Sequence, residues 1–434
     1  MERPQPFFPR RYDKLRSRFV GGRAASSSST GTGSAGEMHR VLTCRRRERL
    51  PRVALLRQPT FAWLAIGRSA AYDALATARP QLQVPHLMSS ASYPPLSIGE
   101  PAPWFTAPML GQEAGADFDK AGGRHVLLLL FGTAAHPACE VALEVLQRHA
   151  SMFADGRAAM LGVTIDPHDA QHPRVQALQR AGMHIFVDAD QQVSRRYGAI
   201  ETTPDGLTLR PYWVLLDPAL RVTGLFPLSA AQEAIATLRQ QCTAPPIDVA
   251  APALVLPHVL DASFAAELIA LHARHGGVES GVMRQVGDRT VEVQNHAVKR
   301  RRDVLVEEPA LQSYLREAIT RRLVPMIERC FQYRPTEIER YLVSCYDARD
   351  HAHFAPHRDN TTPATAHRRL AVTINLNDDY DGGDLRFPEF GMRSYRAPRC
   401  GAIVFSCSLL HEVTRMTAGR RYATLPFLYG GAAG

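Results

Sequence analysis

Three residues with metal-binding side chains stand in a pattern that suits a divalent transition metal. His357 and Asp359 are separated by one residue, so their side chains lie on the same side of an extended segment. His411 follows 52 residues after Asp359. Two imidazoles and one carboxylate on one face of an octahedron bind non-haem Fe(II) and leave three positions open. The sequence therefore predicts an iron site at His357, Asp359 and His411.

Arg421, ten residues after His411, supplies a cation that this chemistry needs. The open positions on the metal take a bidentate 2-oxoacid and O2, and the far carboxylate of a dianionic cosubstrate requires a permanent positive charge. The guanidinium fork suits a carboxylate and does not deprotonate. A surface His/Asp pair is the alternative interpretation of H-x-D alone. The single H-x-D among seventeen histidines, followed by a Gly-Gly-Asp turn, a distal His and this Arg, favours the iron site.

The elements around these residues are mostly strands. Between residues 370 and 377 apolar residues alternate with small or polar ones, which predicts a strand with one polar face. Thr373 and Asn375 fall on that polar face, where they can line a pocket. The segments "GAIVFSC" and "RYATLPFLY" predict further strands, with "DDYDGGD" as a turn. One helix is expected to begin near Asp261 or Ser263, either of which can cap its N-terminus, and to end at Gly276-Gly277. A second helix is expected over about 308–331.

The run from "YDARDHAHFAPHRD" to "RRYATLPFLY" resembles the catalytic core of the Fe(II)/2-oxoglutarate dioxygenases, closest to the prolyl 4-hydroxylase-like branch. The resemblance implies a double-stranded β-helix (jelly-roll) domain with flanking helices over 250–432, with a catalytic core at about 338–431. It implies Fe(II) on the predicted triad and the 2-oxoglutarate C5 carboxylate on Arg421. Such an enzyme uses O2 to hydroxylate a substrate, releasing succinate and CO2, and L-ascorbate is a further cofactor to consider. Protein-bound proline is the typical target, so an unidentified protein substrate is the expected partner.

Two positions near the triad depart from that branch. Many prolyl 4-hydroxylases have Tyr three residues before the first iron histidine, where this chain has Phe354, which cannot donate a hydrogen bond. Tyr346 can take over this role in cosubstrate binding, although a packed strand tyrosine is the alternative. His351 and His353 lack a downstream partner at a suitable spacing and are expected in a loop or behind the site.

An earlier segment, 95–245, alternates strands and helices, which indicates an α/β fold. It resembles the thioredoxin-like superfamily, and the peroxiredoxins within it, through "SIGEPAPWFTAP", the strand–turn–Cys139–helix unit and "RPYWVLLDPALRV". A cysteine at a helix N-terminus can be activated because the helix dipole stabilises a thiolate. The resemblance therefore makes Cys139 a candidate catalytic residue. It leaves open whether this domain docks a partner or protects the iron site.

This redoxin segment departs from the peroxiredoxin pattern. Gly132 and His136 stand where the family has Pro and Thr, and Pro211 replaces the active-site Arg, with Arg210 one residue early. A cis Arg210–Pro211 bond is expected by analogy with thioredoxins. These departures count against peroxidase activity. A thiol-dependent peroxidase using Cys139, with a regulatory C-terminal domain, is the alternative function.

The positive charge of the chain is concentrated at its start. The net charge is +9, but residues 1–87 hold sixteen basic and five acidic residues, a net +11, which leaves −2 for the rest. We expect residues 1–90 to be a basic, low-complexity, disordered tail. An early start codon, an organellar transit peptide and a nucleic-acid tether are the alternatives. Because the remainder is nearly neutral, nucleic acid is not an expected partner.

Composition and cysteine spacing indicate in which cellular compartment the protein is expected. The chain of 434 residues is 45% apolar and 21% charged, as in soluble globular proteins, and no window approaches the roughly 18 to 20 apolar residues of a membrane helix. Seven widely and irregularly spaced cysteines form neither a disulfide framework nor a C-x-x-C pair. We therefore expect a cytoplasmic protein that does not bind membranes.

Overall fold

The computed structural model describes residues 96–203, 206–245, 249–287 and 289–431. The expected tail at 1–90 lies outside these residues. The described residues belong to one compact unit, which contains both folded segments. No helix in the described part of the chain is long and apolar enough to span a membrane.

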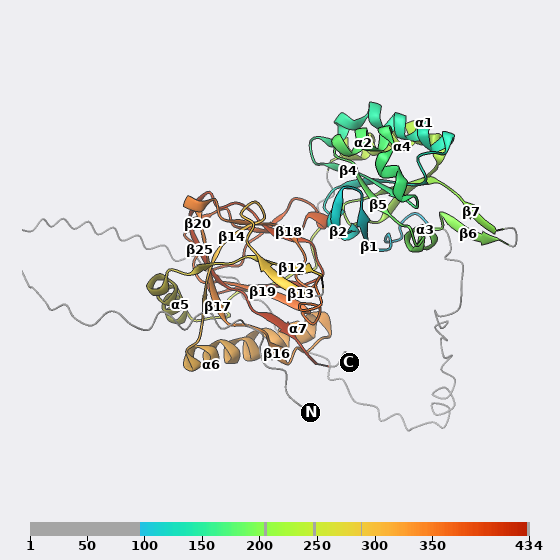
Figure 1. The fold of residues 1–434 in the computed structure, drawn as a ribbon. Helices are drawn as coiled ribbons and strands as arrows, with labels where there is room; N and C mark the ends of the chain where they lie inside the picture. The colour runs from blue at the N-terminus through green and yellow to red at the C-terminus, as the bar shows by residue number, and fades with distance from the viewer. Residues whose placement is uncertain (1–95, 204–205, 246–248, 288, 432–434) are drawn as a thin grey trace, which may run out of the picture. The chain divides into compact units, whose positions relative to one another are not determined.

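The first domain is built on a seven-stranded mixed sheet in the order β2-β1-β5-β4-β3-β8-β9 (Figure 1). The strands are β1 (Thr106–Met109), β2 (Gln112–Asp117), β3 (His125–Gly132), β4 (Ala158–Thr164), β5 (His184–Val187), β8 (Tyr212–Leu216) and β9 (Val222–Pro227). The helices are α1 (Pro137–Arg148), α2 (Pro173–Arg180), α3 (Gln192–Arg196) and α4 (Ala231–Thr243), and β6 (Ile200–Thr203) and β7 (Gly206–Leu209) form a hairpin. The pairs β3–β4 and β4–β5 are parallel, and the other pairs in the sheet are antiparallel.

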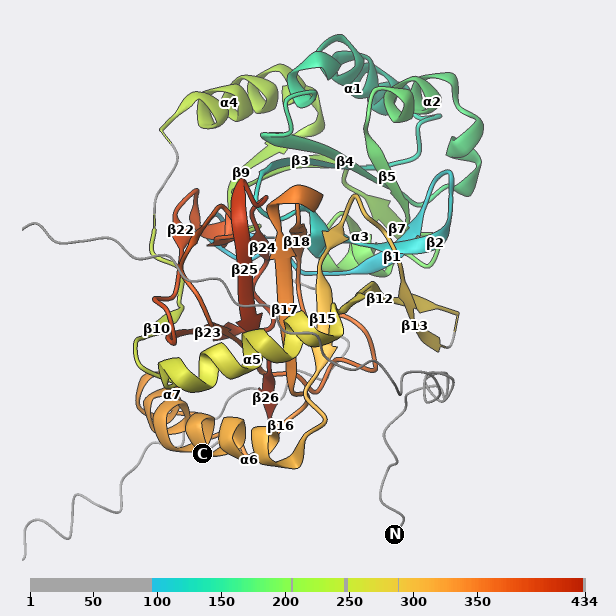
Figure 2. The ribbon, with the colours of Figure 1, turned by 90° about the vertical axis from the view of Figure 1, so that its left-hand side faces the viewer.

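Strand β3 is apolar from Val126 to Phe131 because both of its faces are covered there. Leu127, Leu129 and Phe131 pack under α1, α2 and α4, which lie on one face of the sheet (Figure 2). Val126, Leu128 and Leu130 pack on the opposite face. This arrangement confirms the predicted thioredoxin-like α/β fold.

The second domain consists of two facing antiparallel sheets, which confirms the predicted double-stranded β-helix. The larger sheet follows the order β10-β23-β19-β25-β17-β15-β11, and the smaller one β14-β18-β24-β21-β22. The larger sheet comprises β10 (Leu254–Leu256), β11 (Val278–Glu279), β15 (Arg302–Leu305), β17 (Leu342–Asp347), β19 (Leu370–Asn375), β23 (Ala402–Ser406) and β25 (Ala418–Thr424), with β16 (Glu337–Ile338), β20 (Tyr380–Asp381) and β26 (Phe427–Tyr429) joined to it. The smaller sheet comprises β14 (Lys299–Arg300), β18 (His353–His357), β21 (Leu385–Arg386), β22 (Ser394–Tyr395) and β24 (His411–Val413).

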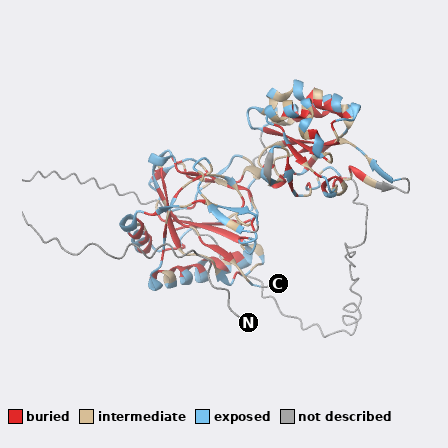
Figure 3. Cartoon of the chain, viewed as in Figure 1, coloured by how far each residue is buried: buried red, intermediate tan, exposed pale blue. Residues whose placement is uncertain are grey.

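The alternation in β19 sorts its side chains between two environments, as its sequence predicts. Leu370, Val372 and Ile374 pack in the core beneath the flanking helices. These helices are α5 (Ala262–His275), α6 (Pro309–Ala318) and α7 (Val324–Phe331). Ala371 faces the other way, into the core between the two sheets, so the neighbouring Thr373 and Asn375 point toward the interior. Figure 3 shows the central strands of both domains in red, as buried, whereas β7, β12 (Val282–Val286) and β13 (Arg289–Val293) are largely exposed.

Three local features differ from the sequence-based expectation. Asp261 precedes α5, but its carboxylate accepts from the Tyr314 hydroxyl and pairs with Arg322, so it does not cap the helix. The helix expected over 308–331 is divided by a π-helical turn at Ile319–Leu323. Pro325 lies just beyond that turn, and because proline lacks an N–H and crowds the preceding turn, it disrupts regular helix there. A hairpin of β12 (Val282–Val286) and β13 (Arg289–Val293) was not expected.

Candidate metal centre

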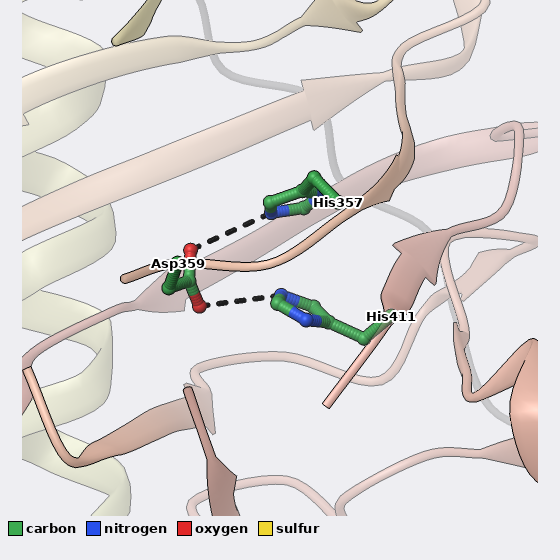
Figure 4. A group of neighbouring side chains, drawn as sticks. All are labelled: His357, Asp359 and His411. Atoms are coloured by element: carbon green, nitrogen blue, oxygen red, sulfur yellow. Dashed lines mark ion pairs between the residues drawn. The ribbon is translucent and has the colours of Figure 1, made fainter. Parts of the chain in front are cut away.

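The three predicted iron ligands come together where β18 meets β24. His357 ends β18 and is the direct cross-strand partner of His411, the first residue of β24. Asp359 follows β18 by two residues and lies between the two imidazoles (Figure 4). His357 Nε2 is 3.5 Å from Asp359 Oδ1, and His411 Nε2 is 3.3 Å from Asp359 Oδ2. One donor atom from each residue lies within 4.8 Å of the others.

The backbone fixes which nitrogen of each histidine is free to ligate. Nδ1 of His357 is 2.8 Å from the Ala355 carbonyl oxygen, and Nδ1 of His411 is 3.0 Å from that of Leu409. A carbonyl oxygen can only accept, so each Nδ1 carries the proton and donates it. Each Nε2 faces Asp359 and is the ring nitrogen that can bind a metal, as in metal-binding histidines.

The spacing and donor types fit a small divalent metal. Ligand atoms at right angles on bonds of about 2.1 Å lie about 3 Å apart. The observed Nε2–Oδ distances of 3.3 and 3.5 Å are close to this value. Two neutral imidazoles and one carboxylate are the donor set of the non-haem Fe(II) triad.

Burial and mutual contact set the protonation of these ligands. Burial opposes ionisation of Asp359, but His411 and His357 beside it outweigh burial and hold its pKa well below the ordinary range. Burial, with His357 nearby, lowers the pKa of His411 to about 4. Asp359 is therefore a carboxylate and His411 a neutral imidazole at pH 7, the forms that bind metals.

Arg421 is a buried cation in the interior between the sheets. Its side chain donates from Nη2 to Thr373 Oγ1 at 2.7 Å, and from Nε and Nη2 to Asn375 Oδ1 at 3.1 and 3.0 Å. Arg421 is 3% exposed. Among the described residues it forms no ion pair, although an unpaired buried charge is costly. The structure thus brings together Arg421 and Thr373, two of the residues predicted to bind the cosubstrate, and no described carboxylate pairs with the guanidinium.

Tyr346 lies beside this guanidinium. It is the cross-strand partner of Arg421 in the β17–β25 pair, and the guanidinium carbon lies 5.5 Å from the centre of its ring. The Tyr346 hydroxyl accepts from Arg301 Nη1 at 3.5 Å. Phe354 instead stacks on the His357 ring, with centroids 3.4 Å apart. Tyr346 therefore packs beside Arg421, whereas Phe354 packs on His357.

The two nearby histidines lie outside the donor cluster, as expected. His353 is buried, and its two ring nitrogens contact the carbonyl oxygens of His351 and Ala297. His351 is exposed and ends the turn before β18, with a positive φ of 49°.

Cys139 lies in an environment that suppresses thiolate formation. It is in the first turn of α1 and fully buried, and its Sγ donates to the Phe131 carbonyl at 2.9 Å. Burial, and then the Asp169 carboxylate, raise the pKa of this thiol to about 11. His136 caps α1 through Nδ1, which accepts from the Ala138 N–H at 3.3 Å. The expected activation of Cys139 by the helix dipole is therefore not supported.

The peptide bond before Pro211 differs from the sequence-based expectation, whereas the backbone at Gly132 accounts for one departure from the family pattern. No peptide bond in the described part of the chain is cis, so the expected cis bond at Pro211 is wrong. The trans form is the one that an X–Pro peptide bond prefers. Gly132 has a φ of +74°, which proline cannot adopt. A Cβ at Gly132 would also lie 2.2 Å from Leu209 Cδ2, so the family's proline does not fit here.

Sequence reasoning missed the buried ionic groups around the site. Arg301 pairs with Asp303 at 2.5 Å, and Asp303 also accepts from Ser344 Oγ at 2.6 Å. Arg358, between two predicted ligands, pairs with Glu389 and with Asp119, 239 residues earlier in the chain. Only its position within H-x-D could have drawn attention to Arg358, because nothing in the sequence indicates its partners.

Two family models match separate parts of the chain. Residues 98–223 match the AhpC/TSA family, and residues 341–429 match the 2OG-Fe(II) oxygenase superfamily. A PKHD-type hydroxylase of Synechococcus sp. (strain JA-2-3B'a(2-13)) is 30% identical over 102 residues, which cover 22% of this chain and 45% of the relative. The chain spans less than half the length of the curated relatives it matches.

Solved structures are similar to each half. Peroxidoxin BcpB from Mycobacterium tuberculosis is 21% identical to this chain, with a TM-score of 0.29. The match covers 33% of this chain and 96% of the BcpB chain. A prolyl hydroxylase from Trichoplax adhaerens, solved in complex with a hypoxia inducible factor oxygen degradation domain peptide fragment, is 19% identical. The match covers 41% of this chain and 83% of the prolyl hydroxylase chain, with a TM-score of 0.33.

Proposed function

We propose that this chain, which joins an AhpC/TSA-type peroxiredoxin domain to a 2OG-Fe(II) oxygenase domain, is an Fe(II)- and 2-oxoglutarate-dependent hydroxylase. The observation that carries the proposal is the convergence of His357, Asp359 and His411 donor atoms within 4.8 Å. Bound Fe(II) supplies the centre at which 2-oxoglutarate and O2 yield succinate and CO2 while a substrate C–H becomes C–OH.

Charge balance supports a dianionic cosubstrate. Fe(II) carries two positive charges, Asp359 contributes one negative charge, and Arg421 contributes one positive charge. The assembled site would therefore hold a net +2, which one 2-oxoglutarate dianion neutralises. The buried guanidinium of Arg421 supports this assignment because it lacks a carboxylate partner among the described residues.

The remaining side chains orient the cosubstrate and exclude water. Thr373 and Asn375 hold the Arg421 fork from the β19 side, so the guanidinium needs little rearrangement to accept a carboxylate. The rings of Phe405 and Phe387 lie 4.7 and 6.5 Å from that of His411, covering it on the interior side. Arg421 is itself 3% exposed, and this shielding from water strengthens its interaction with an anion.

We assign a prolyl residue of a protein as the substrate class, since this is the typical target of the branch that the sequence resembles. The PKHD-type relative supports hydroxylation as the reaction. O2 is the oxidant, and L-ascorbate is a candidate for keeping the iron reduced. We place the activity in the cytoplasm, which the free cysteines at all six described positions support.

The test is succinate release by the full chain loaded anaerobically with Fe(II), given 2-oxoglutarate and then exposed to air. Proline-containing peptides are added in parallel, so that an enzyme needing its prime substrate is also detected. We expect iron-dependent succinate, and a loss of at least about 100-fold in His357→Ala because a ligand is removed.

His351→Asn is the matched control, since this histidine is exposed and asparagine tolerates its positive φ. It should retain wild-type turnover. Equal succinate release by wild type and His357→Ala, or a wild-type protein that binds neither Fe(II) nor 2-oxoglutarate, would contradict the proposal.

A further inference from the structure

Arg358 is the residue between the two ligands His357 and Asp359, and its side chain points away from theirs. The side chain is 2% exposed and meets two carboxylates. Nε donates to Asp119 Oδ2 at 2.8 Å, while Nη1 and Nη2 donate to Glu389 at 3.1 and 2.8 Å. The guanidinium thus binds two carboxylates at once, Asp119 through Nε and Glu389 through Nη1 and Nη2, which the single nitrogen of a lysine cannot reproduce.

Glu389 connects this arginine to the third ligand. Its Oε2 accepts from the Leu410 N–H at 3.0 Å, and Leu410 directly precedes His411. Arg358 Nη1 also donates to the carbonyl oxygen of Ser408 in the same segment. The Arg358–Glu389 pair therefore ties the backbone of the His357–Asp359 segment to the backbone that enters β24.

Asp119 reaches this pair from the first domain. It lies in the short turn Phe118–Ala121 and is 8% exposed. The glycines that follow allow close packing, since a Cβ at Gly123 would lie 2.6 Å from Pro388 Cβ. Trp104 of the same domain adds a ring 4.4 Å from the Arg358 guanidinium carbon. The contact is buried, and it is made at the residue between two ligands.

We infer that the redoxin domain is a structural part of the iron site, and that Asp119 is a positioning residue that acts through Arg358 on the three ligands. The inference rests on the proposed iron site. It gives the domain a role that requires no reactive thiol, consistent with the buried Cys139. Asp119 does not touch the metal or the cosubstrate in this role. Instead, it fixes the guanidinium that holds the ligand segments together.

The test measures Co(II) binding by the full chain, with Co(II) as a stable probe for Fe(II). We compare Asp119→Asn, Arg358→Lys and the double variant by dissociation constant and by the visible spectrum of bound Co(II). Loss of a group that orients metal ligands lowers metal affinity about 10- to 100-fold. We therefore expect each single variant to bind Co(II) about 10- to 100-fold more weakly than wild type, with a changed visible spectrum of the bound Co(II). Because the two residues act together, the double variant should bind no more weakly than Arg358→Lys, within about twofold.

Asp117→Asn is the matched control, because Asp117 is two residues away and pairs with Lys120 at the surface. It should bind Co(II) as wild type does. Asp119→Glu keeps the carboxylate and should restore most of the affinity. If Asp119→Asn binds like wild type, or if Asp119→Glu is as weak as Asp119→Asn, the positioning role is contradicted.

The failure of this inference differs from that of the proposed function. If wild type binds Co(II) and His357→Ala does not, the iron site stands, and the Asp119 variants alone decide the positioning role. If the losses of Co(II) affinity in Asp119→Asn and Arg358→Lys multiply in the double variant, the two residues act independently and the positioning role is overturned. A wild-type protein that binds no Co(II) would contradict the iron site itself.

Discussion

His357 and His411 are direct partners across β18 and β24, with ring centroids 4.2 Å apart. Two histidines separated by 53 intervening residues are thereby held in register by strand pairing. Asp359 is joined to the same strand, so one strand pair positions all three donors. The geometry of the site therefore depends on β18–β24 register and on the groups that secure the segment after His357.

Replacing Arg421 with lysine should weaken cosubstrate binding selectively. Lysine keeps the charge but has a single nitrogen, which cannot replace the bonds of Nε and Nη2 to Asn375 and Thr373 and also donate to a carboxylate as Nη1 can. Charge-assisted hydrogen bonds contribute about 1.5 to 3 kcal/mol each, so loss of one raises KM for 2-oxoglutarate about 10- to 100-fold. Initial rates of succinate release at varied 2-oxoglutarate measure this. An unchanged KM would show that the cosubstrate lies elsewhere.

Thr373→Val should have a smaller effect of the same kind. It removes the oxygen that accepts from Arg421 Nη2 at 2.7 Å. One hydrogen bond contributes about 1 kcal/mol, which corresponds to about a fivefold rise in KM for 2-oxoglutarate. Thr424→Val changes a buried threonine in the same strand as Arg421 and is the control. Equal effects of both variants would assign the change to packing.

Cys139 should be unreactive near neutral pH. Burial and Asp169 raise the pKa of its thiol to about 11. Because the thiolate is the deprotonated form, a raised pKa lowers its fraction, to about one in a thousand at pH 8. Iodoacetamide at pH 8, followed by mass spectrometry, should label the exposed Cys330 but leave Cys139 unmodified.

Cys139→Ser extends this test to function. Succinate turnover should be retained, and the wild-type chain without iron should not consume peroxide. Rapid labelling of Cys139, together with peroxide consumption that Cys139→Ser abolishes, would favour the thiol peroxidase alternative.

Asp303→Asn should destabilise the second domain. Arg301 and Asp303 form a buried pair with side chains 4% and 13% exposed, and Arg301 outweighs burial to hold the pKa of Asp303 at about 2. Removing one charge leaves the other uncompensated, which costs about 3 to 5 kcal/mol in free energy of unfolding. Urea unfolding followed by circular dichroism measures it. Asp350→Asn, at an exposed position, is the control, and a loss no larger than the control's would contradict the prediction.

The sequence was most informative where chemistry and periodicity coincide. The spacing of His357, Asp359 and His411 indicated the triad because few other roles need those residue types together. The alternation in β19 indicated that Thr373 points to the interior, because strand side chains alternate strictly. Helix α5 ends at Gly276 in the left-handed conformation, as the Gly-Gly pair predicts.

Features that depend on distant partners could not be predicted. Neither Arg358 nor Asp119 carries any local sign of their contact, since charged residues are usually solvated. Asp261 looked like a helix cap, but Tyr314 and Arg322 bind its carboxylate. The cis bond expected at Pro211 rested on analogy alone and is absent from the structure.

The most direct test of the iron and 2-oxoglutarate assignment is calorimetric titration of 2-oxoglutarate into the full chain, with and without Mn(II) as a redox-inert substitute for Fe(II). The account predicts binding that requires the metal, is lost in His357→Ala and is weakened at least about tenfold in Arg421→Lys. Metal-independent binding, or wild-type binding that His357→Ala retains, would contradict it.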